Sequence, residues 1–253
     1  MRLLRFALLY LCVTSAVCAV ELDGSANPTF GTSEGILKNA LADLNGDGQP
    51  ERITIEPDAK SGMFLLKIGN QSIRGGTDDS ESEPAEGFEI VDIDNTDRFK
   101  EVVVHPPGAC EMCGQQTYIY GFDKNIRKVG QLGKSVEFPG YGIVLENDWQ
   151  GFWVSRTKYI LDDKSGLLKP VPQPYYFVGL NATVKKSFPI YRNQKRSKEV
   201  VANLKQGSTF MVVAAEYKTE PKWYLVKSET GLMGWISVDS LSYENTEGLP
   251  WAN

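Results

Sequence analysis

Hydrophobic and polar residues alternate in short runs along almost the whole chain, and turn-forming residues separate the runs. Residues 52–56, 64–68 and 101–105 each have the length and composition of a β-strand. Gly69-Asn70 and Asp123-Lys124-Asn125 supply turns. The 3.6-residue period of a helix is almost absent. The pattern therefore predicts an all-β protein.

The expected strands fall into three groups. In the first group they lie at residues 36–41, 52–56, 64–68, 71–73, 88–93, 101–105, 116–122 and 126–132. A less regular group is expected at 142–145, 151–155, 158–161 and 175–178. The last group lies at 182–184, 189–191, 200–204, 209–213, 222–226, 234–236 and 238–241. Short strands at this spacing are typical of β-sandwiches, barrels and related folds.

The first residues have the pattern of a secretory signal peptide. Two arginines precede an apolar run at 6–19, which is shorter than the roughly 20 residues that a membrane-spanning helix needs. We expect cleavage after Ala19 and a periplasmic or secreted mature chain. Cys18 leaves a lipid-anchored form as the alternative. No later segment reaches membrane-spanning length, so we expect no membrane span.

Charge divides the chain into two units. Residues 20–179 carry 15 basic and 25 acidic residues, a net charge of −10, whereas residues 180–253 carry 10 basic and 7 acidic residues, a net charge of +3. We expect a signal peptide, a leader, two domains and a tail: 1–19, 20–33, 34–179, 180–243 and 244–253. The tail contains Leu249-Pro250-Trp251 and is expected to pack back onto a domain. No concentrated basic face is present, so we expect no nucleic-acid partner.

The loop that precedes the second expected strand has the layout of a calcium-binding loop. Oxygen-bearing groups stand at alternate positions: Asp43, Asn45, Asp47, the carbonyl of Gln49, and Glu51. Such oxygens suit calcium, and the carboxylates would repel one another without a cation. We predict one calcium site here. The alternative is that Asp and Asn serve as turn formers that hydrogen-bond the local backbone.

A weaker copy of this loop follows, with Asp92, Asp94 and Glu101 as its candidate ligands. Compared with the spacing of the first loop, Thr96 replaces an acid, and Asp97 and Glu101 each lie one residue further along the chain. No glycine is present. We expect this copy to keep the turn without the ion. Both loops resemble the turn signature of FG-GAP/VCBS-type repeats, which build blades of integrin-like β-propellers in secreted bacterial proteins. Two clear repeats cannot close a propeller of at least about four blades. We therefore expect a propeller-related β-domain of two to three repeat units.

The C-terminal unit resembles the bacterial SH3 (SH3b) domain. Trp223-Tyr224, Gly231 and Gly234-Trp235-Ile236 follow the order of its motifs. The resemblance implies a small SH3-like β-barrel and aromatic side chains that bind cell-wall peptide. The candidate binding residues are Tyr191, Trp223, Tyr224 and Trp235. The alternative is that these rings form the core of the domain.

Cys110 and Cys113 lie between two expected strands. In an oxidising compartment their simplest state is a local disulfide. The alternative is a redox-active pair, but such a pair normally lies at a helix N-terminus, and no helix is expected here. Zinc would need four ligands, and His105 is the only histidine.

The sequence contains no nucleophile elbow, zinc-protease motif or phosphate-binding glycine loop, and we predict no catalytic residue. We expect a non-enzymatic extracytoplasmic binding protein. Its SH3-like domain would bind cell-wall peptide or an envelope protein, and its repeats would form a calcium-stabilised platform. An accessory or inhibitory partner of a cell-envelope enzyme is the alternative. A thiol-disulfide oxidoreductase is a third interpretation.

Overall fold

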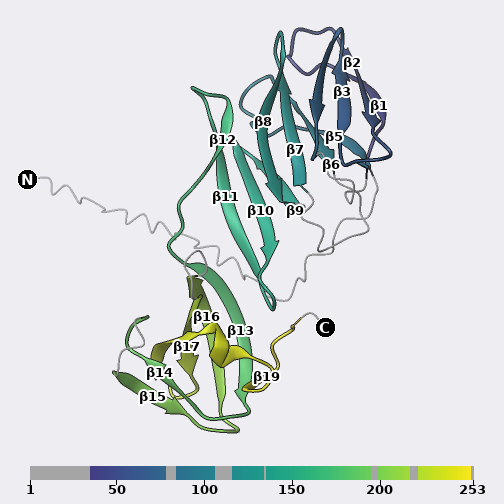
Figure 1. Cartoon of the computed structure of the whole chain (residues 1–253). Coiled ribbons are helices and arrows are strands. Elements are labelled where there is room, and N and C mark those ends of the chain that lie inside the picture. Colours follow the sequence, from purple (N-terminus) through teal and green to yellow (C-terminus); the bar gives the residue numbers. More distant parts are fainter. Residues whose placement is uncertain are drawn as a thin grey trace, which may run out of the picture.

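The computed structural model describes residues 35–77, 84–105, 116–133, 135–194, 199–216 and 222–251. These residues form four antiparallel β-sheets and one 3-10 turn, η1 (Val238–Leu241) (Figure 1). The prediction of an all-β fold is confirmed. Within the described ranges, no helix is long and apolar enough to cross a membrane. The expected signal peptide and leader lie outside the described residues.

The N-terminal part consists of three successive four-stranded sheets, and in each the strands pair in chain order. The first contains β1 (Asn39–Ala42), β2 (Glu51–Pro57), β3 (Phe64–Ile68) and β4 (Gln71–Gly75). The second contains β5 (Gly87–Val91), β6 (Glu101–His105), β7 (Gln116–Phe122) and β8 (Ile126–Gly133). The third contains β9 (Ser135–Gly140), β10 (Ile143–Trp149), β11 (Val154–Asp162) and β12 (Leu167–Pro170).

The middle sheet is buried on both faces. Val102 and Val104 lie in a core shared with the first sheet, whereas Val103 and Ile119 lie in a core shared with the third. Successive residues of a strand point to opposite faces. Three consecutive valines in β6 therefore serve two cores, and the burial of both faces explains why this strand is continuously apolar.

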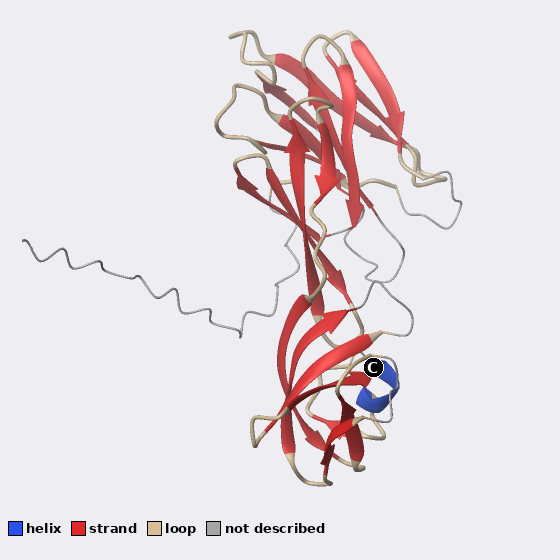
Figure 2. Ribbon diagram, turned by 90° about the vertical axis from the view of Figure 1, so that its left-hand side faces the viewer, coloured by secondary structure: helices blue, strands red, loops and turns tan. Residues whose placement is uncertain are grey.

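The C-terminal part is one seven-stranded sheet with the order β15-β14-β18-β17-β16-β13-β19. Its strands are β13 (Tyr176–Val184), β14 (Phe188–Tyr191), β15 (Val200–Leu204), β16 (Thr209–Glu216), β17 (Trp223–Ser228), β18 (Met233–Ser237) and β19 (Thr246–Glu247). Figure 2 shows these strands gathered beside η1 at one end of the molecule, with the three smaller sheets at the other. The sheet is open, and β15 and β19 are its edges.

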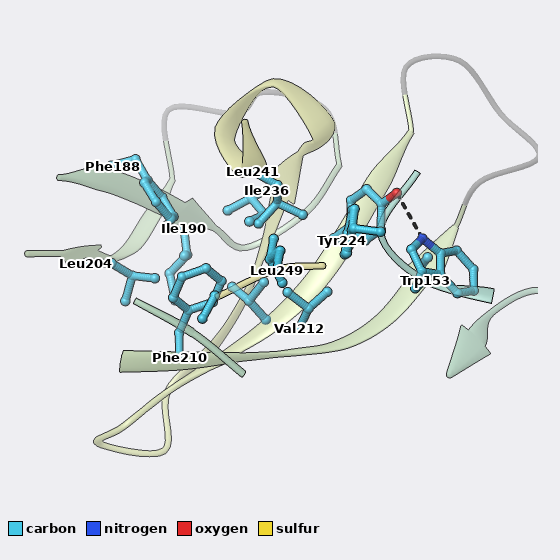
Figure 3. Packing of buried hydrophobic residues seen from close by; sticks show 14 of the residues in the cluster. Trp153, Phe188, Ile190, Leu204, Phe210, Val212, Tyr224, Ile236, Leu241 and Leu249 are labelled. Atoms are coloured by element: carbon cyan, nitrogen blue, oxygen red, sulfur yellow. Dashed lines mark hydrogen bonds between the residues drawn. The ribbon is translucent and has the colours of Figure 1, made fainter. Parts of the chain in front are cut away.

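One face of the C-terminal sheet holds the largest hydrophobic core. Tyr176, Ala215, Tyr224 and Ile236 lie directly opposite one another across four strands, and all four are buried. Leu241 of η1 belongs to the same core, and Figure 3 shows it beside Ile236.

The turn between β10 and β11 inserts two aromatic residues into this core. Phe152 and Trp153 are buried there, and the Trp153 Nε1–H donates to the Tyr224 hydroxyl at 3.2 Å (Figure 3). The Phe152 ring centroid lies 4.6 Å from that of Trp251, and Leu249 belongs to the same core. The tail therefore packs onto the C-terminal unit, as expected, and this unit shares its core with the third sheet.

Two details of the predicted organisation differ from the structure. The boundary expected at residue 179 lies inside β13, because residues 175–178 lead into the C-terminal sheet and do not join the third sheet. The strand expected at Val238–Leu241 is wrong: these residues form η1. Val238 and Leu241 both contact the core, and the three-residue turn of a 3-10 helix places residues at this spacing on one side.

Candidate functional site

The loop between β1 and β2 folds around the carboxylate of Asp43. Asp43 Oδ1 accepts the N–H groups of Gly46 at 2.7 Å and Asp47 at 3.2 Å, and Oδ2 accepts that of Gly48 at 2.8 Å. The glycines have φ of 68° and 85°, a left-handed conformation that glycine adopts without strain. These hydrogen bonds, foremost the one from Gly48, hold the pKa of Asp43 below its ordinary value.

The other predicted ligands of this loop also accept local hydrogen bonds. Asn45 Oδ1 accepts the Asp47 N–H at 2.9 Å, and Asp47 Oδ1 accepts the Gln49 N–H at 2.8 Å. Glu51 Oε2 accepts the Leu44 N–H at 2.9 Å, and Glu51 Oε1 accepts from Asn45 Nδ2 at 3.2 Å. Hydrogen bonds from the loop's own side chains therefore hold its conformation. This is what we expect if Asp and Asn serve as turn formers.

Calcium binding by this loop stays a prediction. Each carboxylate has about four acceptor positions, so the backbone hydrogen bonds do not use up the oxygens of Asp43, Asp47 and Glu51. Within the described ranges, however, no three acidic, histidine or cysteine side chains gather in an arrangement that could hold a metal ion. A cation would have to draw the side chains of the loop closer together.

The loop between β5 and β6 repeats the architecture of the first. Ile93 N–H donates to Glu101 Oε2 at 3.2 Å, just as Leu44 N–H donates to Glu51. Asp94 takes the place of Asn45, since its Oδ1 accepts an N–H group two residues later at 3.1 Å. The carbonyls of Leu44 and Ile93 accept N–H groups from connections within the following sheet: that of Lys100 in the β5–β6 loop at 2.9 Å and that of Gly142 in the β9–β10 turn at 2.8 Å. Each loop therefore ties its sheet to the next.

Glu101 is the most strongly perturbed acid of the second loop. Its side chain is 2% exposed, and burial raises its pKa to about 7 against the opposing hydrogen bond from Ile93. The charges of Asp97 and Asp92 raise the pKa of Glu101 further, and Arg127 lowers it. The candidate ligands Asp92 and Glu101 thus lie close enough to repel one another.

The four predicted binding aromatics do not form one cluster. Trp223 and Tyr224 are consecutive in β17 and therefore point to opposite faces. Tyr224 is fully buried on the core face, and Trp223 is buried on the outer face. Tyr191 and Trp235 are directly opposite across β14 and β18, and both are partly exposed on the outer face.

Tyr191 and Trp235 belong to a longer apolar row on the outer face. Directly opposed residues from six strands form it: Phe177, Ala214, Leu225, Trp235, Tyr191 and Val200. Opposed residues in antiparallel strands share a face, and no member of the row is fully buried. Neighbouring strands lie about 4.8 Å apart, so the five intervals make the row about 24 Å long. We call these six residues the cross-strand row.

Two further exposed residues, Tyr175 and Lys227, lie beside the cross-strand row. Tyr175 is 52% exposed, and its ring centroid lies 5.8 Å from that of Trp235. Lys227 shares the face of Leu225, lies between Met211 and Met233, and is exposed. Within the described part of the chain, no acidic side chain forms an ion pair with Lys227. The surface is therefore apolar, with a cation at its flank.

Most of this row could not be predicted from the sequence, because its members are far apart along the chain. Ala214, Leu225 and Val200 have no distinctive local motif, and only the strand register brings them together. One signal was present. The run Tyr175-Tyr176-Phe177 places three consecutive aromatic rings at the start of an expected strand, and alternation along a strand requires that neighbouring rings point to opposite faces.

The structure describes the surroundings of the lone histidine but not those of the predicted disulfide. Cys110 and Cys113 lie outside the described residues, as do Cys18 and Ala19. His105 Nε2 lies 3.0 Å from Glu89 Oε1, and β6 and β5 are paired strands, so this contact is a cross-strand pair. Such a pair belongs to the sheet surface.

Comparisons of the chain with protein-family models, with curated proteins and with solved structures find no match. The geometry of the described residues is therefore the basis for a functional argument. The site that this geometry supports best is the cross-strand row.

Proposed function

We propose that this chain is a non-enzymatic extracytoplasmic binding protein and that its partner docks on the cross-strand row. The partner is a cell-wall peptide or a protein of the cell envelope. In this proposal the C-terminal sheet acts as an SH3-like binding unit. The three smaller sheets act as a propeller-related platform that carries it.

The observation that carries the proposal is the exposure of the row. A sheet with one face on a core normally turns polar residues to water on the other face. Here six apolar or aromatic residues in register occupy that second face, and Phe177 is 76% exposed. Aromatic side chains such as Tyr191 and Trp235 are the residues that most often anchor a bound partner.

The platform supports the proposal by holding the binding unit in place. Phe152 and Trp153 fasten the third sheet to the core beneath the row. A calcium ion at the first loop, held by Asp43, Asn45, Asp47 and Glu51, would stiffen the opposite end by neutralising the carboxylates. Binding at the row does not depend on that ion.

Retention on bacterial cell envelopes tests the proposal. We expect the mature chain to be retained on purified envelopes, and Trp235→Ala and Phe177→Ser to reduce retention at least tenfold. Tyr141→Ala is the matched control, because Tyr141 is a 70% exposed aromatic residue in the β9–β10 turn, outside the row. Equal retention of all four proteins would reject the row as the binding surface. A parallel measurement on peptidoglycan freed of protein separates the two classes of partner.

A further inference from the structure

We propose that Met211 and Met233 form an oxidant-sensitive modification site that controls binding at the cross-strand row. Conversion of these two thioethers to sulfoxides releases the partner, and reduction back to methionine restores binding. This inference rests on the proposed function, because it assigns a means of regulation to the same surface.

The two methionines lie on either side of one lysine. Met211 of β16 and Met233 of β18 are both directly opposite Lys227 of β17. Asn181 of β13 is in turn opposite Met211. We call these four residues the flanking row. Directly opposed side chains have Cβ atoms about 5 Å apart, so the long side chain of Lys227 is within reach of both thioethers.

The flanking row borders the cross-strand row on the outer face. Met233 lies two residues before Trp235 in β18. Lys227 lies two residues after Leu225 in β17. Residues two apart in a strand share a face and lie about 6.8 Å apart. A partner that covers Trp235 therefore also lies against Met233, whose flexible apolar side chain adds contact area.

Met233 is open to a dissolved oxidant. It is 46% exposed, more than either of the other two methionines within the described ranges, Met63 and Met211, which are half-buried. Methionine is converted to its sulfoxide where an oxidant can reach the sulfur. We therefore expect Met233 to react first among these three residues, and Met211 to follow because it shares the lysine.

The position of Lys227 suits oxidation by a peroxide. The thioether sulfur donates a lone pair to one peroxide oxygen, so that a sulfur–oxygen bond forms and the oxygen–oxygen bond breaks. The sulfur is oxidised by two electrons, and the departing hydroxide takes up a proton and leaves as water. The Lys227 ammonium donates a hydrogen bond where this negative charge develops. In the part of the chain that the structure describes, no ion pair with an acid occupies that ammonium.

The sulfoxide makes the border of the cross-strand row polar. Oxidation converts a flexible apolar side chain into a polar one whose oxygen accepts hydrogen bonds from water or from the Lys227 ammonium. A partner docked on Trp235 would have to remove this water without replacing its hydrogen bonds, and that opposes binding. Met211 and Met233 lie outside the hydrophobic core on the other face. Oxidation therefore weakens binding and leaves the fold intact.

Limited treatment of the full mature chain with hydrogen peroxide tests the proposal, with mass spectrometry and envelope retention as readouts. We expect Met233 to gain one oxygen before Met63 does. Retention on purified envelopes should fall at least tenfold once Met233 and Met211 are oxidised. Methionine sulfoxide reductases for both sulfoxide epimers should then restore it. Lys227→Gln should slow the oxidation of Met233 severalfold, and an unchanged rate would overturn the part assigned to the lysine.

A double variant, Met211→Leu with Met233→Leu, separates this site from other oxidation events. Leucine keeps an apolar side chain of similar volume that peroxide does not oxidise, so we expect retention before and after treatment. Met63→Leu is the matched control and should stay sensitive. Loss of retention in the treated double variant, or full retention of a wild-type chain oxidised at Met233, would overturn the proposal and leave the proposed function standing. A wild-type chain that is not retained before treatment refutes the proposed function, and the regulation with it.

Discussion

The buried carboxyl of Glu101 makes the stability of the second loop depend on pH. Its pKa is raised from 4.5 to about 7, chiefly by burial, so the fold favours the protonated form. Between these values the folded chain binds more protons than the unfolded chain, and its stability falls as pH rises through this window. The separation of the two pKa values corresponds to about 3 kcal/mol.

Glu101→Gln removes this dependence. Glutamine keeps an oxygen that can accept the Ile93 N–H, and it carries no charge at any pH. We expect the variant to equal the wild type near pH 4.5 and to be more stable by about 3 kcal/mol at pH 8. For a chain of this length that difference raises the Tm by about 6 to 12 °C.

Denaturant titrations at pH 4.5, 6, 7 and 8 measure the effect. Glu51→Gln is the matched control, because Glu51 accepts the equivalent N–H from Leu44 at a more exposed position. Parallel pH profiles for wild type and Glu101→Gln would refute the reasoning. A Glu101→Gln variant that is less stable than the wild type at pH 8 would show that the carboxylate is ionised and paired in the fold.

Three further changes test other parts of the account. Phe152→Ala should destabilise the chain by about 3 to 5 kcal/mol in thermal unfolding, because it opens the core shared by the two parts, whereas the exposed Trp149→Ala should cost far less. Calcium titration by calorimetry should give a binding heat that Asp43→Ala abolishes; no heat would leave the loop as a plain turn. Cys110→Ser should leave the rate unchanged in a disulfide-reduction assay, and a lost activity would favour the oxidoreductase interpretation.

The strands with clear local signals were predictable from the sequence. β3, β6, β7 and β15 have the expected bounds, because alternation and turn residues act within a few positions. β9 and β12 were not expected. Both are edge strands of the third sheet and contain proline, Pro139 and Pro170, which weakens a strand pattern.

The functional surface was predictable only in part. Their aromatic chemistry predicts Tyr191 and Trp235 as binding residues, and the two lie together on the outer face. The same chemistry predicts Tyr224, but strand alternation places it in the core. The remaining members of the cross-strand row are determined by strand register, including the register shift between Val212 and Ala214 that turns Ala214 outward. Register depends on pairing between distant segments and is not visible in a local pattern.

Envelope retention of four proteins tests the central claim most directly: wild type, Trp235→Ala, Phe177→Ser and Tyr141→Ala. The account predicts that wild type and Tyr141→Ala remain bound to purified envelopes, while both row variants are washed off with unchanged melting temperatures. Retention of the two row variants at the wild-type level would contradict it, because the partner would then bind elsewhere on the chain.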